Sequence, residues 1–472
     1  MIVHEAAREI EVLDTVDVLV AGGGVSGCAA ALAAARAGAK TMLLERNGTL
    51  GGVATTGLMA NIGNLFMDRD GRIVIHGIAK EVVERMVARG AASSHWASRE
   101  VPGIVIDSEQ LKVVLIGMLR EADVLVLTHT WAARPILEGD TVTGAFCETK
   151  IGRHAVLARV VVDATGEADV AAQTGCPMRW DSGSASLEFK MGRVDLEALY
   201  QHFRQHPETF PVGMDMVKGF AEFERNWVER GIFFFPHGGG RKWDILQRAI
   251  VAGELETARG VLWRMDAAGL YGLKGRDTVI VNSNFWRVDT LHPAAVSQAE
   301  LEAHEACYYV ADFFLRHVPG FEHAYVVQVA TDLGIRTSRG IEGIKTLFEA
   351  AARAGERQPD VVGCAPVRAS FDETGEFFAS CSFDIPYGIL LPQNVHGLLI
   401  GSGKSVSCQP QGLIRGMSTC MLLGQAAGTA AALAAFRGIS PQQLQVDALQ
   451  RELLRQGAYL GSQQRLQELG LA

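Results

Sequence analysis

Apolar and polar residues alternate in blocks that predict buried strands and helices along the chain. Near the N-terminus, the apolar run 16–21 leads into glycines, an alanine-rich stretch to residue 36 and a second apolar run at 41–44. Short apolar runs bounded by turn residues indicate buried strands, whereas a longer run of small apolar residues indicates a buried helix. Strand, helix and strand in this order form a βαβ unit, which predicts an α/β fold with a parallel sheet.

Further apolar runs extend the predicted sheet. Residues 124–130 indicate the next parallel strand, and residues 160–163 indicate another, which leads into the turn Ala164-Thr165-Gly166. Between them, three short runs separated by turn residues predict a three-stranded β insertion, with strands at 132–137, 142–148 and 154–160.

The glycines after the first strand have the spacing of a dinucleotide-binding turn. Gly22, Gly24 and Gly27 stand as G-x-G-x-x-G, which allows a tight turn, backbone approach to a pyrophosphate and close helix–strand packing. The following helix then directs its partial positive charge at the phosphates. Glu45 closes the second strand at about the spacing of 20 residues expected for a ribose-binding carboxylate. This segment therefore predicts a Rossmann-like dinucleotide site.

A second glycine pair follows the acid. Arg46 leads through a short turn to Gly51 and Gly52, which suits a second backbone approach to phosphate. An NAD enzyme has no general need of this pair, so FAD is the favoured dinucleotide.

The chain resembles the FAD-dependent oxidoreductase family with the glutathione-reductase-type FAD fold. The resemblance covers most of the chain. It rests on DVLVAGGGVSGCAAALAAARAGAKTMLLERNGTLGG, VVDATGEADVAAQTG, NSNFWRVDTLHP, HVPGFEHA, LGIRTSRGIEG, FDIPYGILLPQNVHGLLIGSGKSVS and IRGMSTCMLLGQAAGTAAALA. It implies FAD as the cofactor, a Rossmann-like FAD-binding domain, and a second, mixed α+β substrate domain over the flavin face.

The late stretch LLIGSGKSVS ends like a nucleotide-binding P-loop but is out of register. A P-loop needs glycine four residues before Gly-Lys-Ser, and here that position is Leu398. The resemblance instead implies a strand at 398–400 and a turn in which Gly401 and Gly403 pass the FAD pyrophosphate and ribityl chain. The family usually has Gly-Arg where this chain has Gly-Ser-Gly-Lys, so contact of Lys404 with FAD phosphate and its exposure to solvent both stay open.

A long helix is expected to follow this turn. It would open at Gly412-Leu413 and run to residue 436, with its N-terminus at the flavin and with Gln411 and Leu413 beside the ring. Arg415 would lie one turn into this helix, where it either reaches flavin or substrate or pairs with a surface acid.

The flavin-binding segments are expected to be discontinuous, at 12–63, 105–180 and 388–436. The substrate or cap domain would comprise 64–104 and 181–387, and 437–472 would form a helical C-terminal tail. The residues expected to bind FAD are Gly22, Gly24, Val25, Ser26, Gly27, Glu45, Arg46, Gly51, Gly52, Ala132, Ala164, Thr165, Gly166, Gly401, Gly403, Gln411, Gly412 and Leu413.

The other catalytic candidates each have a structural alternative. Arg336 and Arg339 are three residues apart and would share a face of a helical turn. The resemblance places them near flavin or substrate, and the alternative is an ion pair with Glu342 or Asp332. His237, before three glycines, is either a mobile base or an ordinary loop residue.

Two further features are expected to be structural rather than catalytic. Cys408 has no resolving cysteine nearby, so a redox role is not favoured. An aromatic cluster is expected to pack in the core, comprising Phe233, Phe234, Phe235 and Trp243.

Composition narrows the classes of partner. The net charge of −9, without a long run of Lys or Arg, gives no support for a nucleic-acid surface. The 8 cysteines include no CxxC pair, so neither a metal site nor a paired redox centre is expected. Charged residues at the start argue against a signal peptide, which predicts a cytoplasmic protein. Residues 417–436 mimic a membrane span, but their Ala, Gly and Gln content favours a buried helix.

The predicted function is that of an FAD-dependent oxidoreductase. A small organic molecule would exchange hydride with flavin N5, and the late helix would stabilise the charge that develops near N1 and C2=O. No second G-x-G-x-x-G is visible, so the electron acceptor stays open among oxygen, a quinone and a partner protein. The open alternatives are a flavin monooxygenase, a redox-neutral lyase or hydratase with structural FAD, and a non-enzymatic flavin-bound scaffold. The oligomeric state is not determined by the sequence.

Overall fold

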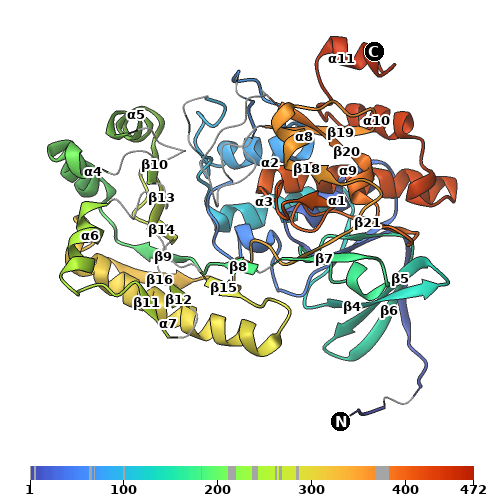
Figure 1. Cartoon of the computed structure of the whole chain (residues 1–472), viewed down its shortest axis with the longest axis horizontal. Coiled ribbons are helices and arrows are strands. Elements are labelled where there is room, and N and C mark those ends of the chain that lie inside the picture. The colour runs from blue at the N-terminus through green and yellow to red at the C-terminus, as the bar shows by residue number, and fades with distance from the viewer. Residues whose placement is uncertain are drawn as a thin grey trace.

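The elements of the fold gather into two groups in the computed structural model. Elements from both ends of the chain share one group, and elements from the middle form the other (Figure 1). The described residues are 2–4, 7–62, 66–68, 70–98, 101, 103–181, 183–210, 219–235, 243–260, 263–264, 268–282, 286–366 and 382–472.

The first group is built on a 7-stranded sheet in the order β3-β2-β1-β6-β5-β4, with β21 also paired to β6. Parallel pairing joins β1 to β2 and β6, β2 to β3, and β21 to β6. The strands are β1 (Val12–Ala21), β2 (Thr41–Leu44), β3 (Leu125–Leu127), β4 (Trp131–Glu138), β5 (Thr141–Thr149), β6 (Gly152–Asp163) and β21 (Leu398–Ile400). The predicted α/β class and parallel sheet are confirmed.

The three-stranded insertion is present, but one predicted boundary is wrong. Its strands β4, β5 and β6 pair antiparallel. The separate strands expected at 154–160 and 160–163 are the single strand β6, whose second half runs parallel to β1 and β21. No turn residue interrupts the chain near residue 160, so the strand continues from the insertion into the parallel sheet.

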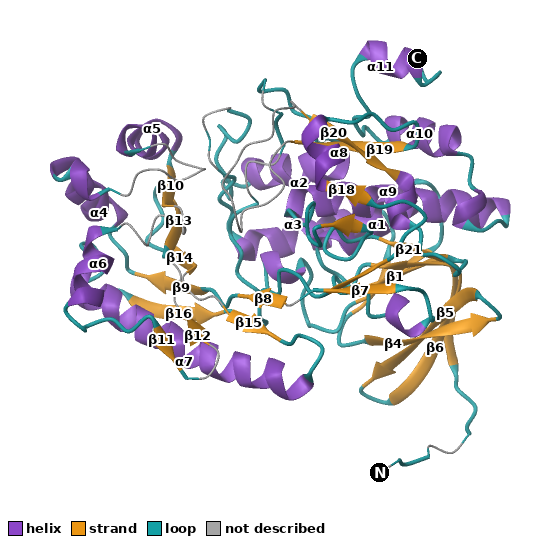
Figure 2. Ribbon diagram, viewed as in Figure 1, coloured by secondary structure: helices purple, strands orange, loops and turns teal. Residues whose placement is uncertain are grey.

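The second group is built on a 5-stranded antiparallel sheet in the order β10-β13-β14-β9-β16. Its strands are β9 (Phe189–Gly192), β10 (Ile232–Phe235), β13 (Gly269–Leu273), β14 (Val279–Asn282) and β16 (Tyr325–Val329). The long helix α7 (Pro293–His317) lies along this group (Figure 2). The predicted mixed second unit is therefore present.

The remaining elements are helices and short strand pairs. The other helices are α1 (Val25–Arg36), α2 (Gly77–Ala88), α3 (Ser108–Glu121), α4 (Leu196–Gln205), α5 (Phe220–Arg230), α6 (Asp244–Val251), α8 (Glu349–Ala354), α9 (Met417–Arg437), α10 (Val446–Arg455) and α11 (Gln463–Glu468). The paired short strands are β7 (Met178–Trp180) with β17 (Arg339–Ile341), β8 (Gly183–Ala185) with β15 (Trp286–Val288), β11 (Ala258–Arg259) with β12 (Trp263–Arg264), β18 (Leu347–Phe348) with β22 (Cys408–Gln409), and β19 (Val361–Pro366) with β20 (Ser382–Pro386).

Two large apolar cores correspond to the two sheets. The first contains β1, α1 and α9, and the second contains β9, β10 and α7. Helix α2, from a segment that we expected in the substrate domain, packs into the first core, as does part of the segment that follows β17. In the C-terminal segment, α10 also packs there through Leu449 and Leu453. The aromatic cluster Phe233 to Phe235 with Trp243 is buried in the second core, as predicted.

The late helix begins later than predicted. Helix α9 starts at Met417 with Gly416 as its cap, not at Gly412. Gly412 has φ +78°, in the left-handed region that an α-helix does not use. The segment before α9 instead turns, and the Arg415 N–H donates a hydrogen bond to the Gly412 carbonyl at 3.1 Å.

Helix α9 lies against α1 (Figure 1). A Cβ on Gly424 would lie 2.0 Å from the Ser26 carbonyl oxygen, and a Cβ on Gly428 would lie 2.0 Å from that of Ala30. Helix α9 is long and apolar enough to cross a membrane, but 89% of its apolar window is buried inside the protein. This agrees with the prediction of a buried core helix.

We expect Gly428→Ala to destabilise the protein, because its Cβ would force the two helix backbones apart. Overpacking of this kind costs about 1–3 kcal/mol of unfolding free energy. The control is Gly117→Ala in α3, where a Cβ meets no atom within 4 Å. That change should be neutral or stabilising by about 0.5–1 kcal/mol, since glycine is unfavourable inside a helix. Equal urea midpoints for the two variants would contradict the close packing of α1 and α9.

Candidate active site

The first glycine turn packs closely against other backbone at Gly22 and Gly27 but is open at Gly24. A Cβ on Gly22, at φ +97°, would lie 2.7 Å from the Ala164 carbonyl oxygen, and one on Gly27 would lie 1.8 Å from that of Gly22. The same construction at Gly24 meets nothing nearer than the Gly52 Cα at 4.0 Å. Gly22 and Gly27 are therefore required for packing, whereas Gly24 leaves backbone open to a ligand.

The start of α1 offers uncapped donors at this open surface. Gly24 is its N-cap residue, and no side chain accepts a hydrogen bond from the first turn. The N–H groups of Val25, Ser26 and Gly27 have no intrahelical acceptor by their position in the helix. Such an N-terminus is suited to bind phosphate.

The second glycine pair lies against the first turn. The Gly51 N–H donates to the Gly23 carbonyl at 2.8 Å, and Gly51 pairs with Gly24 in an isolated bridge. Gly51 and Gly52 both have positive φ, at +104° and +52°. Gly22 to Gly27, Gly51 to Gly52 and Ala164 to Gly166 thus form one surface, which we call the glycine cradle.

Glu45 is buried at the edge of the cradle. Its Oε2 accepts a hydrogen bond from the Gly23 N–H at 2.6 Å, and its Oε1 accepts one from the Asn47 N–H at 2.8 Å. Burial raises the pKa of Glu45, and the two N–H donors oppose that rise. Each carboxylate oxygen has a second lone pair, which can accept a hydroxyl group of the ligand.

Two expected ligand residues lie just outside Glu45. Arg46 is half exposed and lies over the Trp131 ring, with its Nη2 3.8 Å from Asp332. Ala132 is buried in β4, two residues after Thr130, whose N–H donates to the Glu45 carbonyl.

Asp163 organises the third part of the cradle, and sequence reasoning missed it. Its Oδ1 accepts from the Thr165 N–H and hydroxyl, at 3.1 and 2.6 Å. Its Oδ2 accepts from the N–H groups of Val170 and Ala171, both at 2.9 Å. Burial raises the pKa of Asp163, and these donors oppose the rise. An acid at the end of an apolar strand, as at Glu45, was the signal that could have identified it.

The late turn meets the cradle from the other side. The Gly401 N–H donates to the Asp163 carbonyl at 2.8 Å, and a Cβ on Gly403 would lie 2.2 Å from the Ile414 carbonyl oxygen. The partly buried Lys404 places its Nζ 3.5 Å from the position that a Cβ on Gly166 would take. Its ammonium has no ion-pair partner among the residues that the structure describes. Lys404 therefore lies at the cradle, which favours contact with a phosphate over exposure to solvent.

Beside this turn, the Gln411 side chain is hydrogen-bonded to the backbone of Lys404. Its Nε2 donates to the Lys404 carbonyl, while its buried Oε1 has no hydrogen-bond partner within the described part of the chain. Leu413 is buried in the first core.

Three of the four catalytic candidates lie in the part of the chain that the structure describes. Arg339 lies on β17 rather than on a helical turn, and its Nη2 pairs with Asp169 at 2.6 Å while its Nε donates to the Glu167 carbonyl. Its partner is therefore neither Glu342 nor Asp332. Arg415 precedes α9. His237 lies outside the described residues.

Arg336 instead belongs to a buried polar group beside the 5-stranded sheet, which also contains Glu188, Tyr271 and Asn282. Glu188 and Asn282 are each 1% exposed, and neither carboxylate oxygen of Glu188 nor either amide atom of Asn282 has a hydrogen-bond partner among the described residues. Burial raises the pKa of Glu188 well above its ordinary value, and Arg336 opposes the rise in part. Burial and, to a smaller extent, the charge of Glu188 raise the pKa of the Tyr271 hydroxyl. Asn282 and Asn61 oppose this rise. Sequence reasoning missed these residues because no motif joins them: Glu188 precedes β9, Tyr271 lies in β13 and Asn282 ends β14.

Backbone hydrogen bonds connect this polar group to the cradle. The Ala330 N–H donates to the Glu188 carbonyl at 2.9 Å, and the Thr331 N–H donates to the Thr56 carbonyl at 2.8 Å. Thr56 follows the second glycine pair in the chain, and Asn61 lies a few residues further. We call residues 51–62, 184–188 and 330–336 the junction, because they join the glycine cradle to the 5-stranded sheet.

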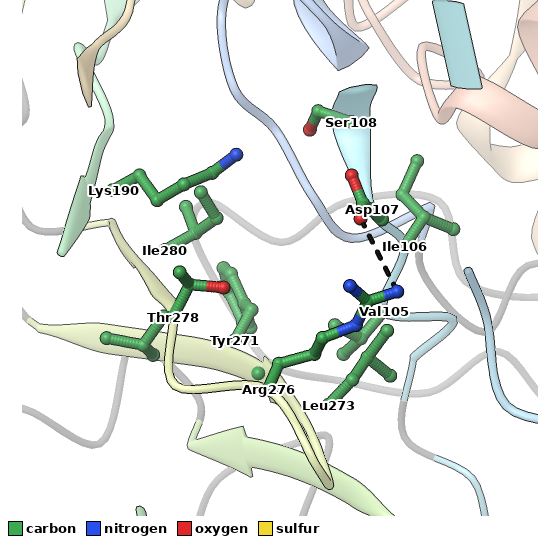
Figure 3. A pocket seen from close by; sticks show the side chains of 12 residues that line it. Val105, Ile106, Asp107, Ser108, Lys190, Tyr271, Leu273, Arg276, Thr278 and Ile280 are labelled. Carbon is green, nitrogen blue, oxygen red and sulfur yellow. Dashed lines mark ion pairs between the residues drawn. The ribbon is translucent and has the colours of Figure 1, made fainter. Parts of the chain in front are cut away.

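A cleft reaches the polar group from the surface (Figure 3). Tyr271 lines it together with Lys190, Arg276 and, from the start of α3, Asp107 and Ser108. The Arg276 guanidinium lies 3.9 Å from the Asp107 carboxylate across the cleft. Tyr271 thus belongs to both the cleft and the buried group.

Comparison with known proteins identifies the family. The model of the family described as FAD dependent oxidoreductase matches residues 17–453. The chain belongs to the FAD dependent oxidoreductase family. It is accordingly an enzyme, and FAD is its cofactor.

Relatives of this oxidoreductase include two curated reductases from Methanopyrus kandleri. Digeranylgeranylglycerophospholipid reductase 2 is 28% identical over 251 residues, covering 51% of this chain and 60% of the relative. Digeranylgeranylglycerophospholipid reductase 1 is 29% identical over 206 residues, covering 43% of this chain and 54% of the relative. The chain thus spans little more than half the length of the curated relatives it matches.

Solved structures similar to the oxidoreductase include two with nearly full coverage. A geranylgeranyl bacteriochlorophyll reductase-like protein from Thermoplasma acidophilum has 15% identity and a TM-score of 0.44, over 97% of this chain and 99% of that one. The p-nitrophenol 4-monooxygenase of Pseudomonas putida has 12% identity and a TM-score of 0.47, over 97% and 93%. At these values the likeness supports no functional comparison.

The cradle of the oxidoreductase fits FAD. The open backbone at Gly24, the uncapped start of α1 and the Lys404 ammonium beside Gly166 together suit a pyrophosphate. Glu45 has acceptor capacity left for ribose hydroxyls.

We expect Lys404→Met to weaken FAD binding while Lys404→Arg keeps it, because the ammonium lies beside the cradle and forms no ion pair with a described carboxylate. A charge-assisted hydrogen bond is worth about 1.5–3 kcal/mol, or roughly tenfold or more in the dissociation constant. Titration of the apoprotein with FAD measures this. Unchanged affinity in Lys404→Met would show that Lys404 does not contact the phosphates.

Proposed function

We propose that the protein transfers hydride between a small organic molecule and flavin N5, with FAD bound in the manner of the glutathione-reductase type. The second glycine pair and the three-stranded insertion support this binding mode. The observation that carries the proposed reaction is the junction. It leads from the glycine cradle to the Glu188 carboxylate, whose two oxygens accept no hydrogen bond from the residues that the structure describes.

Each part of the chain has a role in this proposal. The start of α1 and Lys404 hold the pyrophosphate, and Glu45 holds the adenosine ribose. Bound FAD supplies the acceptance and donation of two electrons as hydride. The junction and the inner face of the 5-stranded sheet position the substrate and exclude water from it.

Stabilisation of charge at flavin N1 and C2=O belongs to the same proposal. Helix α9 begins at Met417 and has no side-chain cap, so its first N–H groups are available to an acceptor. These groups, rather than a helix start at Gly412, are the donors we assign to that role.

We also propose the location of the protein, the segments that surround the flavin and the partner that regenerates it. We place the protein in the cytoplasm, with the cofactor segments 12–63, 105–180 and 388–436 around the flavin and a small molecule as substrate. The acceptor or donor that regenerates the flavin is oxygen, a quinone or a partner protein.

Anaerobic mixing tests the proposed reaction. The purified protein should be yellow and release FAD on denaturation, and one class of alcohols, amines or unsaturated carbonyl compounds should change its flavin spectrum by two-electron reduction or oxidation. The control is the same mixing with free FAD. A flavin that stays unchanged while the protein adds water to a substrate, or eliminates it, would make the enzyme a redox-neutral lyase. A requirement for both NAD(P)H and oxygen would make it a monooxygenase.

A further inference from the structure

Three buried carboxylates near the junction differ in how their charge is compensated. Asp163 accepts hydrogen bonds from three backbone N–H groups and from the Thr165 hydroxyl. Glu45 accepts hydrogen bonds from two backbone N–H groups. Glu188 has none on either oxygen among the described residues, although it is 1% exposed. A buried polar group without a partner is costly, so a native fold that keeps one needs a reason, such as a ligand.

The strand register places the polar groups on one face of the sheet. Tyr271 pairs with Ile280, which pairs with Lys190, and Val281 pairs with Phe189. Since alternate residues of a strand share a face, Asn282 lies on the same face as Tyr271. Glu188 immediately precedes β9, and the Ala330 N–H that donates to its carbonyl extends the strand pairing by one residue, which places Glu188 on that face too. Both faces contribute to the second apolar core, with Phe189 and Val281 on one face and Tyr271 and Ile280 on the other.

The buried group also has a route to solvent. Tyr271 lines the cleft of Figure 3 and lies beside Asn282 and Glu188. The cleft lies between the start of α3 and the β13–β14 hairpin, and Tyr271 is the member of the buried group that lines it. Glu188 and Asn282 are thus buried, while their neighbour Tyr271 borders a cleft at the surface.

We infer that Glu188, Asn282 and Tyr271 form the substrate-binding site, and that the substrate carries a hydroxyl or carbonyl oxygen on its reacting carbon, with which Glu188 exchanges a proton. This inference rests on the proposed function. The Asn282 amide and the Tyr271 hydroxyl supply further donors to that oxygen. Arg336 and Tyr271 are the titratable groups that face Glu188 in the described residues, and Lys190 lies two residues along its own strand.

The reaction balances as the transfer of one hydride and one proton. In the direction of oxidation, the substrate C–H bond breaks and its electron pair leaves as hydride for oxidised FAD. The O–H bond breaks at the same carbon, its proton passes to the Glu188 carboxylate, and a C=O bond forms. In the reverse direction, the carbonyl carbon accepts hydride from reduced FAD while the Glu188 carboxyl group protonates the oxygen. A neutral, buried acid is suited to this second role.

Unfolding of the FAD-loaded protein across pH tests the state of Glu188 without a substrate. If its pKa in the folded protein is raised, the native state keeps a proton that the unfolded chain has released. Stability then falls as pH rises from the unfolded pKa of a glutamate toward the higher folded value. Glu188→Gln removes this dependence, so the variant should gain stability relative to the parent as pH rises over that window. The control is Glu84→Gln, at an exposed i,i+4 pair with Lys80, which should show no such trend.

A panel of probes tests the substrate class. We would mix the FAD-loaded enzyme anaerobically with primary and secondary alcohols, with their aldehydes and ketones after reduction by dithionite, and with amines. The flavin should respond to carbinols or carbonyl compounds, and Glu188→Gln should slow that response about 100-fold. The dithionite reduction itself should be unchanged in the variant. The pH dependence of the parent's rate should also be lost.

The outcomes separate this inference from the proposed function. A flavin that responds only to amines, or to none of the carbinol and carbonyl probes, overturns the substrate class. A response that survives in Glu188→Gln, or a stability difference that does not change with pH, overturns the role of Glu188 and leaves hydride transfer standing. Absence of bound FAD overturns the proposed function itself.

Discussion

The cofactor half of the protein depends on helix α1 being packed by backbone on two sides. Gly27 lies against the Gly22 carbonyl, and α9 brings Gly424 and Gly428 against the carbonyls of Ser26 and Ala30. A single methyl group at any of these glycines would meet main-chain oxygen at about 2 Å. This constraint fixes the first turn of α1 in space, and with it the donors that can face a pyrophosphate. It also explains why α9 is made of small residues without being a membrane span.

The buried carboxylates Asp163 and Glu45 differ from the buried carboxylate Glu188 in their hydrogen-bond partners. Asp163 uses its charge to hold the turn that stacks on Gly22, and Glu45 uses its charge to hold the Gly23 backbone. Arg339 completes the support by pairing with Asp169 in the same turn. Glu188 is buried equally well, but its carboxylate accepts no hydrogen bond from any residue in the described ranges. The difference in hydrogen-bond partners, rather than in burial, separates an acid that supports the fold from one that is suited to chemistry.

Local patterns were sufficient to predict the cofactor half. Glycine spacing, short apolar runs and a terminal acid are contiguous in sequence, so β1, α1, β2 and the insertion could be predicted from the chain alone. The start of α9 could not, because it depends on the left-handed φ of Gly412 and on the turn around it. The buried polar group could not either, since Glu188, Tyr271 and Asn282 are far apart in sequence and come together only where β9, β13 and β14 pair in the antiparallel sheet. The helical turn expected for Arg336 and Arg339 was wrong because Arg339 pairs in β17 with a strand distant in sequence.

The most direct test of the account is a crystal structure of the protein with FAD bound. The account predicts that the pyrophosphate lies at the start of α1 and that the flavin ring lies at the junction. Its N5 should face Glu188 across a space that holds one small molecule, with reacting atoms about 3–3.5 Å apart once a substrate is bound. A flavin ring that lies away from the junction, with protein between N5 and the Glu188 carboxyl group, would contradict the account.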